Sequence, residues 1–321
     1  MLREVYPHIY LNEIPLPKSP LKTLNNYIIL AEDRALILDT GYDRKICKEA
    51  LVAGIKEIGL DLKRAELVLT HMHVDHTGLA YFLWQEGCKV YIGEKDGKLL
   101  DNYRTSPKEI IKKLSKGFNL HRELEDREIQ AYAIAAQEAF PYTSLKEGDC
   151  LEVGPYKFEI IDLPGHTPGH IGLYEREHKL FFAGDHILNE ITPNIAFWHY
   201  KIDSLGNYME SLHKVRQMEI DLVLPAHRSL IRNHRERIDE LLDHHEERLK
   251  EIKEILRQGR MTVLETAAQM HWDLNSGNWE EFPLTQKWFA SGEAMSHLEH
   301  LVYKGEVRRL EINGDQYYEL I

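Results

Sequence analysis

The feature that most limits the possible folds of this chain is a histidine-rich cluster directly after an apolar segment. Residues 66–70 have the pattern of a buried strand, and the sequence HMHVDH follows them. Alternate side chains of an extended backbone point the same way, so His71 and His73 share one side, and the next turn brings Asp75 and His76 to a second point. Such polar groups are costly at the edge of a core unless they bind metal. The pattern therefore predicts a site shared by two metal ions.

Three more candidate ligands lie at the ends of later apolar segments. His166 follows KFEIIDL, Asp185 follows LFFA and His227 follows LVLP. In layered α/β folds, the loops after the strands gather at one edge and carry the functional residues. Each signal alone is weak, because a histidine or aspartate at a strand end usually belongs only to a turn. In this order, and with the first cluster, they predict one site assembled from several loops.

These motifs resemble those of the metallo-β-lactamase superfamily. THMHVDHTG, GHTPGH, AGDH and PAH occur in the family's order, across residues 20–230. The resemblance implies an α/β fold, the αββα sandwich, with a binuclear metal centre. It also implies how the ligands are shared: His71, His73 and His166 for one metal, Asp75, His76 and His227 for the other, and Asp185 as the bridging carboxylate. Asp39, in LILDTG, would support the first ligand loop without binding metal.

The expected chemistry follows from this ligand set. Imidazole and carboxylate suit zinc, and manganese or iron would also fit. A metal-bridging hydroxide, oriented by Asp75 as a catalytic residue, would attack a small ester, thioester or related bond. His170 and His186 lie beside ligands and are expected to hold the ligand loops. An aromatic run later in the chain is a candidate wall of the substrate pocket: Trp198, His199 and Tyr200.

Other branches of the same superfamily define the alternatives. A β-lactamase is disfavoured because Asp185 fills the bridging position and no export signal is visible. The homoserine lactonase branch would have a tyrosine where Leu188 stands. An endoribonuclease and an iron-dependent persulfide dioxygenase, which uses one iron, stay open. We expect a binuclear hydrolase of a small molecule.

The chain is expected to contain a catalytic domain and a smaller C-terminal domain. A long charged stretch with a helical pattern interrupts the catalytic domain. It is expected to form a cap over the metals. The last residues resemble the winged-helix domain that accompanies some hydrolases of this superfamily. The predicted limits are 1–230 for the catalytic domain, 101–139 for its helical insertion, 231–258 for a connecting helix and 259–321 for the winged helix.

Charge and cysteine content set the expected partners and compartment. The formal net charge is −12, and residues 261–321 carry ten acidic against four basic residues, so nucleic-acid binding is disfavoured. No apolar stretch reaches the roughly 18 residues that a membrane span needs. Three cysteines without a CxxC pair favour a reducing cytoplasm. We expect a cytoplasmic enzyme with a small-molecule substrate, which could form a homo-oligomer.

Overall fold

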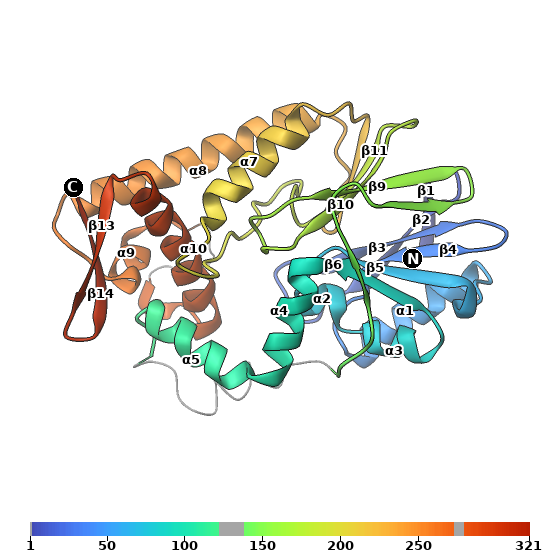
Figure 1. The fold of residues 1–321 in the computed structure, drawn as a ribbon, viewed down its shortest axis with the longest axis horizontal. Coiled ribbons are helices and arrows are strands. Elements are labelled where there is room, and N and C mark those ends of the chain that lie inside the picture. The colour runs from blue at the N-terminus through green and yellow to red at the C-terminus, as the bar shows by residue number, and fades with distance from the viewer. Residues whose placement is uncertain (1, 122–137, 273–278) are drawn as a thin grey trace. The chain divides into compact units, whose positions relative to one another are not determined.

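The computed structural model describes residues 2–121, 138–272 and 279–321 (Figure 1). The chain divides into two compact units whose segments interleave. The first consists of Met1–Arg104, Gln137–Pro193 and Ser211–Ile238, and the second of Thr105–Ala136, Asn194–Glu210 and Asp239–Ile321. The domain limits that we expect from the sequence stay predictions.

The first unit contains a seven-stranded mixed sheet. Its strands, in spatial order, are β1 (Leu2–Tyr6), β2 (Ile9–Pro15), β3 (Thr23–Leu30), β4 (Ala35–Leu38), β5 (Ala65–Leu69), β6 (Lys89–Gly93) and β7 (Thr143–Leu145). Neighbours from β1 to β4 are antiparallel, and neighbours from β4 to β7 are parallel. Parallel strands end at the same edge, so the loops after β4, β5 and β6 meet there.

A second sheet of five strands belongs to the same unit. Its spatial order is β12 (Leu222–Pro225), β11 (Leu180–Gly184), β10 (Ile171–Glu175), β9 (Tyr156–Asp162) and β8 (Cys150–Val153). β11 and β12 are parallel and the other neighbours are antiparallel. Every residue of β10 and β11 is buried, which explains why their sequences are almost continuously apolar.

The core of the first unit lies between the two sheets. One cluster joins side chains of both, among them Val68 of β5, Phe158 of β9 and Leu224 of β12. The rings of Tyr27 and Phe182 meet edge to face, with centroids 5.2 Å apart. The helices α1 (Lys45–Glu57) and α3 (Ala80–Gln85) accompany the larger sheet on one side (Figure 1). This arrangement confirms the predicted α/β sandwich.

The second unit is mostly helical. It contains α5 (Pro107–Gly117), the start of α7 (Ser204–Arg216), most of α8 (His234–Leu256), α9 (Val263–Gln269), α10 (Leu284–Tyr303) and the hairpin β13 (Val307–Ile312) and β14 (Asp315–Leu320). All residues from Ala290 to Leu301 of α10 are buried. Asn313 and Gly314 turn the hairpin with positive φ angles, as their sequence predicts.

Some elements differ from the sequence prediction. β1, β2 and β7 have no counterpart among the apolar segments identified in the sequence. The described part of the predicted insertion includes the end of α4 (Glu94–Thr105) and α5; its limits stay a prediction, and its part in 122–137 lies outside the described residues. Short turns complete the fold: η1 (Leu62–Arg64), α2 (Val74–Thr77) and η2 (Trp279–Glu281). Within the described ranges, no helix is long and apolar enough to cross a bilayer.

Candidate metal centre

The first ligand loop leaves β5 and changes conformation within a few residues. His73 is still extended, with φ −62° and ψ 148°, and caps the single-turn helix α2. His71 and His73 therefore belong to the extended part, and Asp75 and His76 to the helical turn. The predicted division of this cluster into two points is observed.

The other candidate ligands come from the second sheet. His166 follows β9, Asp185 follows β11 and His227 follows β12, and all three are buried. Gly184 has φ +52°, and a Cβ atom there would lie 2.7 Å from Nε2 of His170. Only glycine lets the chain make this turn so close to the imidazole and so deliver Asp185 to the centre.

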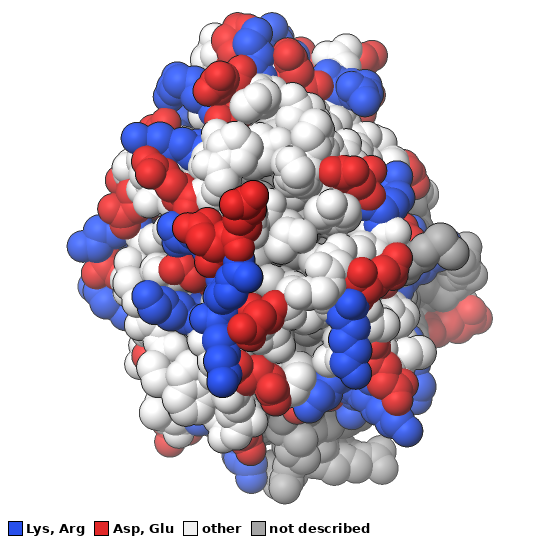
Figure 2. All heavy atoms as spheres, turned by 90° about the vertical axis from the view of Figure 1, so that its right-hand side faces the viewer, with Lys and Arg blue, Asp and Glu red and all other residues white. Residues whose placement is uncertain are grey.

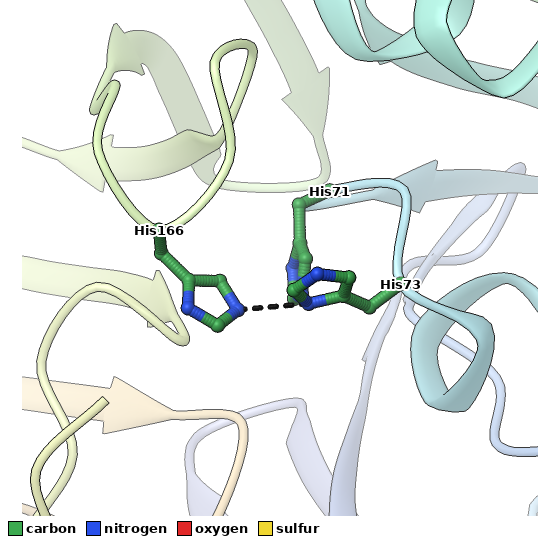
Figure 3. Close-up of side chains that lie close together, drawn as sticks. All are labelled: His71, His73 and His166. Carbon is green, nitrogen blue, oxygen red and sulfur yellow. Dashed lines mark hydrogen bonds between the residues drawn. The ribbon is translucent and has the colours of Figure 1, made fainter. Parts of the chain in front are cut away.

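Three histidines converge at one point (Figure 3). Nε2 of His71 lies 3.0 Å from Nδ1 of His73, and Nε2 of His166 lies 2.9 Å from that same Nδ1. His71 and His73 come from the larger sheet and His166 from the smaller one. They form one of the groups whose ligand atoms could hold a common metal ion.

A second group lies next to the first. Oδ2 of Asp75 is 3.8 Å from Nε2 of His76 and 3.6 Å from Nε2 of His227. Asp185 lies between the two groups: its Oδ2 is 3.6 Å from Nε2 of His166 and 3.5 Å from that of His76, and its Oδ1 is 3.4 Å from that of His227. This is the position expected of a bridging carboxylate.

The donor set fits two divalent cations. Ligand atoms around tetrahedral zinc, with bonds of about 2.1 Å, are about 3.4 Å apart, close to the separations around Asp185. Among the described residues, three atoms that face this space are buried without a hydrogen-bond partner: Nε2 of His76, Nε2 of His227 and Oδ1 of Asp185. Orphaned buried polar atoms are costly, and metal ions would remove that cost. The centre is therefore a binuclear metal-binding cluster.

The protein itself keeps His71 and His73 neutral. Burial lowers the pKa of His71 well below its usual value, and lowers that of His73 to about 3, with neighbouring imidazoles adding to the effect. Burial would raise the pKa of Asp75, but His76 and His227 outweigh it and bring the value to about 2. Neutral imidazoles and ionised carboxylates are the forms that bind metal.

Hydrogen bonds behind the ligands fix which ring nitrogen faces the centre. Nδ1 of His76 lies 2.8 Å from Oδ2 of Asp39, and Nδ1 of His227 donates to the carbonyl of Thr23 at 2.7 Å. Asp39 also accepts from the amide and the hydroxyl of Thr70, both at 2.8 Å. Each bond to Nδ1 leaves Nε2 to face the metals. Asp39 thus contacts one predicted ligand and the residue before the first cluster, and its supporting role stays a prediction.

The two neighbouring histidines are also buried beside the ligands. The ring of His170 stacks on that of His71 at 5.0 Å, and its Nε2 accepts a hydrogen bond from the amide of Asp185 at 3.1 Å. The ring of His186 lies 6.3 Å from that of His170. His170 thus contacts one predicted ligand from each sheet.

The predicted pocket residues belong to the second unit. The hydroxyl of Tyr200 bonds to the side chain of Gln316, and the guanidinium of Arg309 lies 4.1 Å from its ring centre. The side chain of His199 accepts from the amide of Lys201 at 3.1 Å. The role of Trp198, His199 and Tyr200 in a substrate pocket stays a prediction.

Sequence reasoning missed Asp96, a fully buried acid that accepts hydrogen bonds from both ligand loops of the first histidine group. The signal was present, because Asp96 closely follows the apolar strand β6, as the other acids of the site follow theirs.

Comparisons with known proteins agree with this geometry. A family model described as "Metallo-beta-lactamase superfamily" matches residues 23–227. A hydroxyacylglutathione hydrolase of Haemophilus influenzae is 34% identical over 158 residues, which are 48% of this chain and 61% of that protein. A human acyl-coenzyme A thioesterase is 24% identical over 216 residues, 63% of this chain and 72% of that protein. The crystal structure of a Thermus thermophilus metallo-beta-lactamase family protein has the same fold, with a TM-score of 0.84 at 24% identity over 99% of this chain and 100% of that one.

Proposed function

The chain belongs to the metallo-beta-lactamase superfamily and is a metallohydrolase of that fold, and we propose that it hydrolyses a thioester at a centre of two zinc ions. The observation that carries the proposal is the position of Asp185, whose two oxygens face both ligand groups. The named relatives act on thioesters of glutathione and of coenzyme A, which supports this bond as the substrate.

The residues of the centre have separate tasks in such a reaction. Bound divalent cations would polarise the thioester carbonyl and lower the pKa of a water molecule. The Asp75 carboxylate, ionised at neutral pH, would accept a hydrogen bond from the attacking water and orient it. His170 holds the backbone of Asp185 through its amide. No side chain of the centre needs to serve as a covalent nucleophile.

Zinc is the metal that we assign to the site. Its five imidazoles and two carboxylates are nitrogen and oxygen donors of the kind that zinc binds at the separations observed here. The same set would accept manganese or iron, so bound metal needs direct measurement. A single iron per chain would favour the persulfide dioxygenase alternative.

The C-terminal residues 259–321 are proposed to be a winged-helix domain that packs or dimerises. Supporting this, Thr262 and Glu265 form a reciprocal capping box at the start of α9, and Met261 pairs with Tyr318 of the hairpin. The surplus of acidic residues in this segment opposes RNA binding. Figure 2 draws another face, the one on the right of Figure 1, and there basic and acidic side chains are interspersed. A small molecule is therefore proposed as the substrate. The cytoplasm is proposed as the compartment, because the three cysteines include no CxxC pair.

The decisive experiment is an activity screen on the zinc-loaded protein. Its substrates are a hydroxyacylglutathione, a series of acyl-coenzyme A esters, a lactone, a β-lactam and RNA. We expect turnover of one thioester class, lost in His71→Ala and kept in His213→Ala, which removes an exposed histidine of α7. Turnover of RNA or lactone without any thioester would overturn the proposal.

A further inference from the structure

Asp96 is a buried carboxylate in the first turn of α4 that belongs to none of the ligand groups formed by the described residues. Its Oδ2 accepts hydrogen bonds from the amide of Met72 at 2.9 Å and from the hydroxyl of Thr167 at 2.6 Å. Its Oδ1 accepts from the amide of Gly169 at 2.6 Å. A carboxylate with three donors and no exposure is a strong, fixed point of attachment.

The three donors all belong to the loops of the first histidine group. Met72 lies between His71 and His73 in the sequence, and Thr167 follows His166. One side chain of α4 therefore ties the loop of the larger sheet to the loop of the smaller sheet, at the two places from which these histidines extend. Asp96 acts on the ligands only through neighbouring residues of their loops.

Two glycines keep this attachment close. A Cβ atom at Gly169 would lie 2.2 Å from the amide nitrogen of Asp96, and one at Gly93 would lie 2.2 Å from the carbonyl oxygen of Gly169. No other residue leaves room for the start of α4 to approach the loop after β9 in this way. Because the backbone segments pack so closely, they fix the position of the Asp96 carboxylate.

The loop of His227 has a different support. The side-chain amide of Asn25 on β3 donates to the carbonyls of Pro225 at 3.0 Å and Arg228 at 2.8 Å, on either side of His227. His227 itself donates to the carbonyl of Thr23. These bonds share no atom with those of Asp96. Each metal position thus has an attachment of its own.

We propose that Asp96 is a positioning residue for one metal position only: it sets how tightly His71, His73 and His166 bind their ion and leaves the ion of Asp75, His76 and His227 unaffected. The inference rests on the binding of two metals and is independent of the bond that the enzyme cleaves. Supporting hydrogen bonds of this kind change metal affinity by about 10- to 100-fold.

The test is a zinc titration of the full-length apoprotein against a chromophoric chelator, which resolves the affinity of each site. The variant Asp96→Asn is nearly isosteric. Its side-chain NH₂ group, however, cannot accept the hydrogen bonds that the carboxylate accepts. We expect one zinc site to weaken about 10- to 100-fold and the other to keep the wild-type affinity. Asn25→Ala, the matched control, should weaken the other site.

Two backgrounds identify which site responds. In His227→Ala, where only the first group is complete, adding Asp96→Asn should weaken the remaining site about 10- to 100-fold. In His166→Ala, adding it should leave the remaining site unchanged. Equal weakening in both backgrounds, or no change in either, would overturn the proposal. Neither result depends on whether a thioester is hydrolysed.

A milder pair of variants covers the case in which Asp96→Asn does not fold. Thr167→Val removes one of the three donors with little change in shape and should weaken the same site by a smaller factor. Thr167→Ser keeps the hydroxyl and should restore the wild-type affinity. If Thr167→Val and Thr167→Ser bind zinc alike at both sites, the hydrogen bond does not set the affinity and the proposal fails.

Discussion

Nε2 of His166 lies 2.9 Å from Nδ1 of His73, although the two residues are 93 positions apart and belong to different sheets. The first metal position therefore exists only when the sheets are packed face to face (Figure 3). A metal ion bound there would link the two halves of the sandwich. Metal binding and the stability of the first unit should consequently be coupled.

Metal removal is expected to destabilise the protein reversibly. A ligand that binds only the folded state, present at 100 times its dissociation constant, adds about 2.7 kcal/mol to the free energy of unfolding. Treatment with a chelator should therefore lower the melting temperature by several degrees, and zinc should restore it, whereas calcium should not. Differential scanning calorimetry at fixed protein concentration measures the shift. Equal melting temperatures with and without zinc would contradict the coupling.

Replacing Asp185, the carboxylate that we propose to bridge two metals, should affect the binding of both. In Asp185→Asn the charge next to His76, His166 and His227 is lost while the shape is kept. Since supporting residues alone change affinity by about 10- to 100-fold, we expect the loss of at least one metal equivalent and at least a 100-fold fall in kcat/KM. Elemental analysis and kinetics measure the two effects. Asp221→Asn, at an exposed acid, is the control, and two fully retained metals in Asp185→Asn would count against a bridging role.

Adding one methyl group at Gly169 should lower the free energy of unfolding. The new Cβ of Gly169→Ala would lie 2.2 Å from the backbone nitrogen of Asp96, so α4 or the His166 loop must move. Overpacking of this kind typically costs about 1–3 kcal/mol. Gly117→Ala in α5, whose Cβ would meet atoms no closer than 3.4 Å, is the control and should change little. Urea denaturation compares the two, and equal stabilities would show that the loop adapts freely.

The sequence predicts the metal ligands better than the groups that hydrogen-bond to the ligands and their loops. A histidine or aspartate at the end of an apolar strand is visible in the sequence, and seven such residues converge in the structure. Several of the supports are backbone groups, such as the carbonyl of Thr23 and the amide of Met72, and almost any residue type can supply these. Whether Asp96 can bond to such groups depends on how two sheets and a helix pack together. Local sequence patterns do not predict this packing.

Strands that depend on pairing with other strands were also missed by the sequence analysis. β1 and β2 are short of regular alternation and lie at or near a sheet edge, and β7 has only three residues, so its pairing with β6 defines it. The hairpin of β3 and β4 was predictable because a polar turn separates two apolar runs.

A pair of buried histidines should make the second unit sensitive to acid. His297 of α10 donates from Nδ1 to the carbonyl of Glu293 at 2.8 Å, and its Nε2 lies 3.0 Å from Nδ1 of His245. Burial lowers the pKa of His297 to about 3 from its ordinary 6.5, with help from Arg248 and His244. The histidine is therefore neutral in the folded state and takes up a proton on unfolding whenever the pH is below 6.5.

The sign of the effect follows from this difference in protonation. Because the folded-state pKa is depressed, the stabilisation is complete above pH 6.5 and is lost as the pH falls toward 3. One such group lowers the free energy of unfolding by about 1.4 kcal/mol for each pH unit below its unfolded-state pKa. His297→Gln cannot take up the proton, so its stability should fall less steeply between pH 6.5 and 5 than that of the wild type. Urea denaturation at several pH values measures the two slopes, and parallel slopes would show that His297 does not contribute to the acid sensitivity.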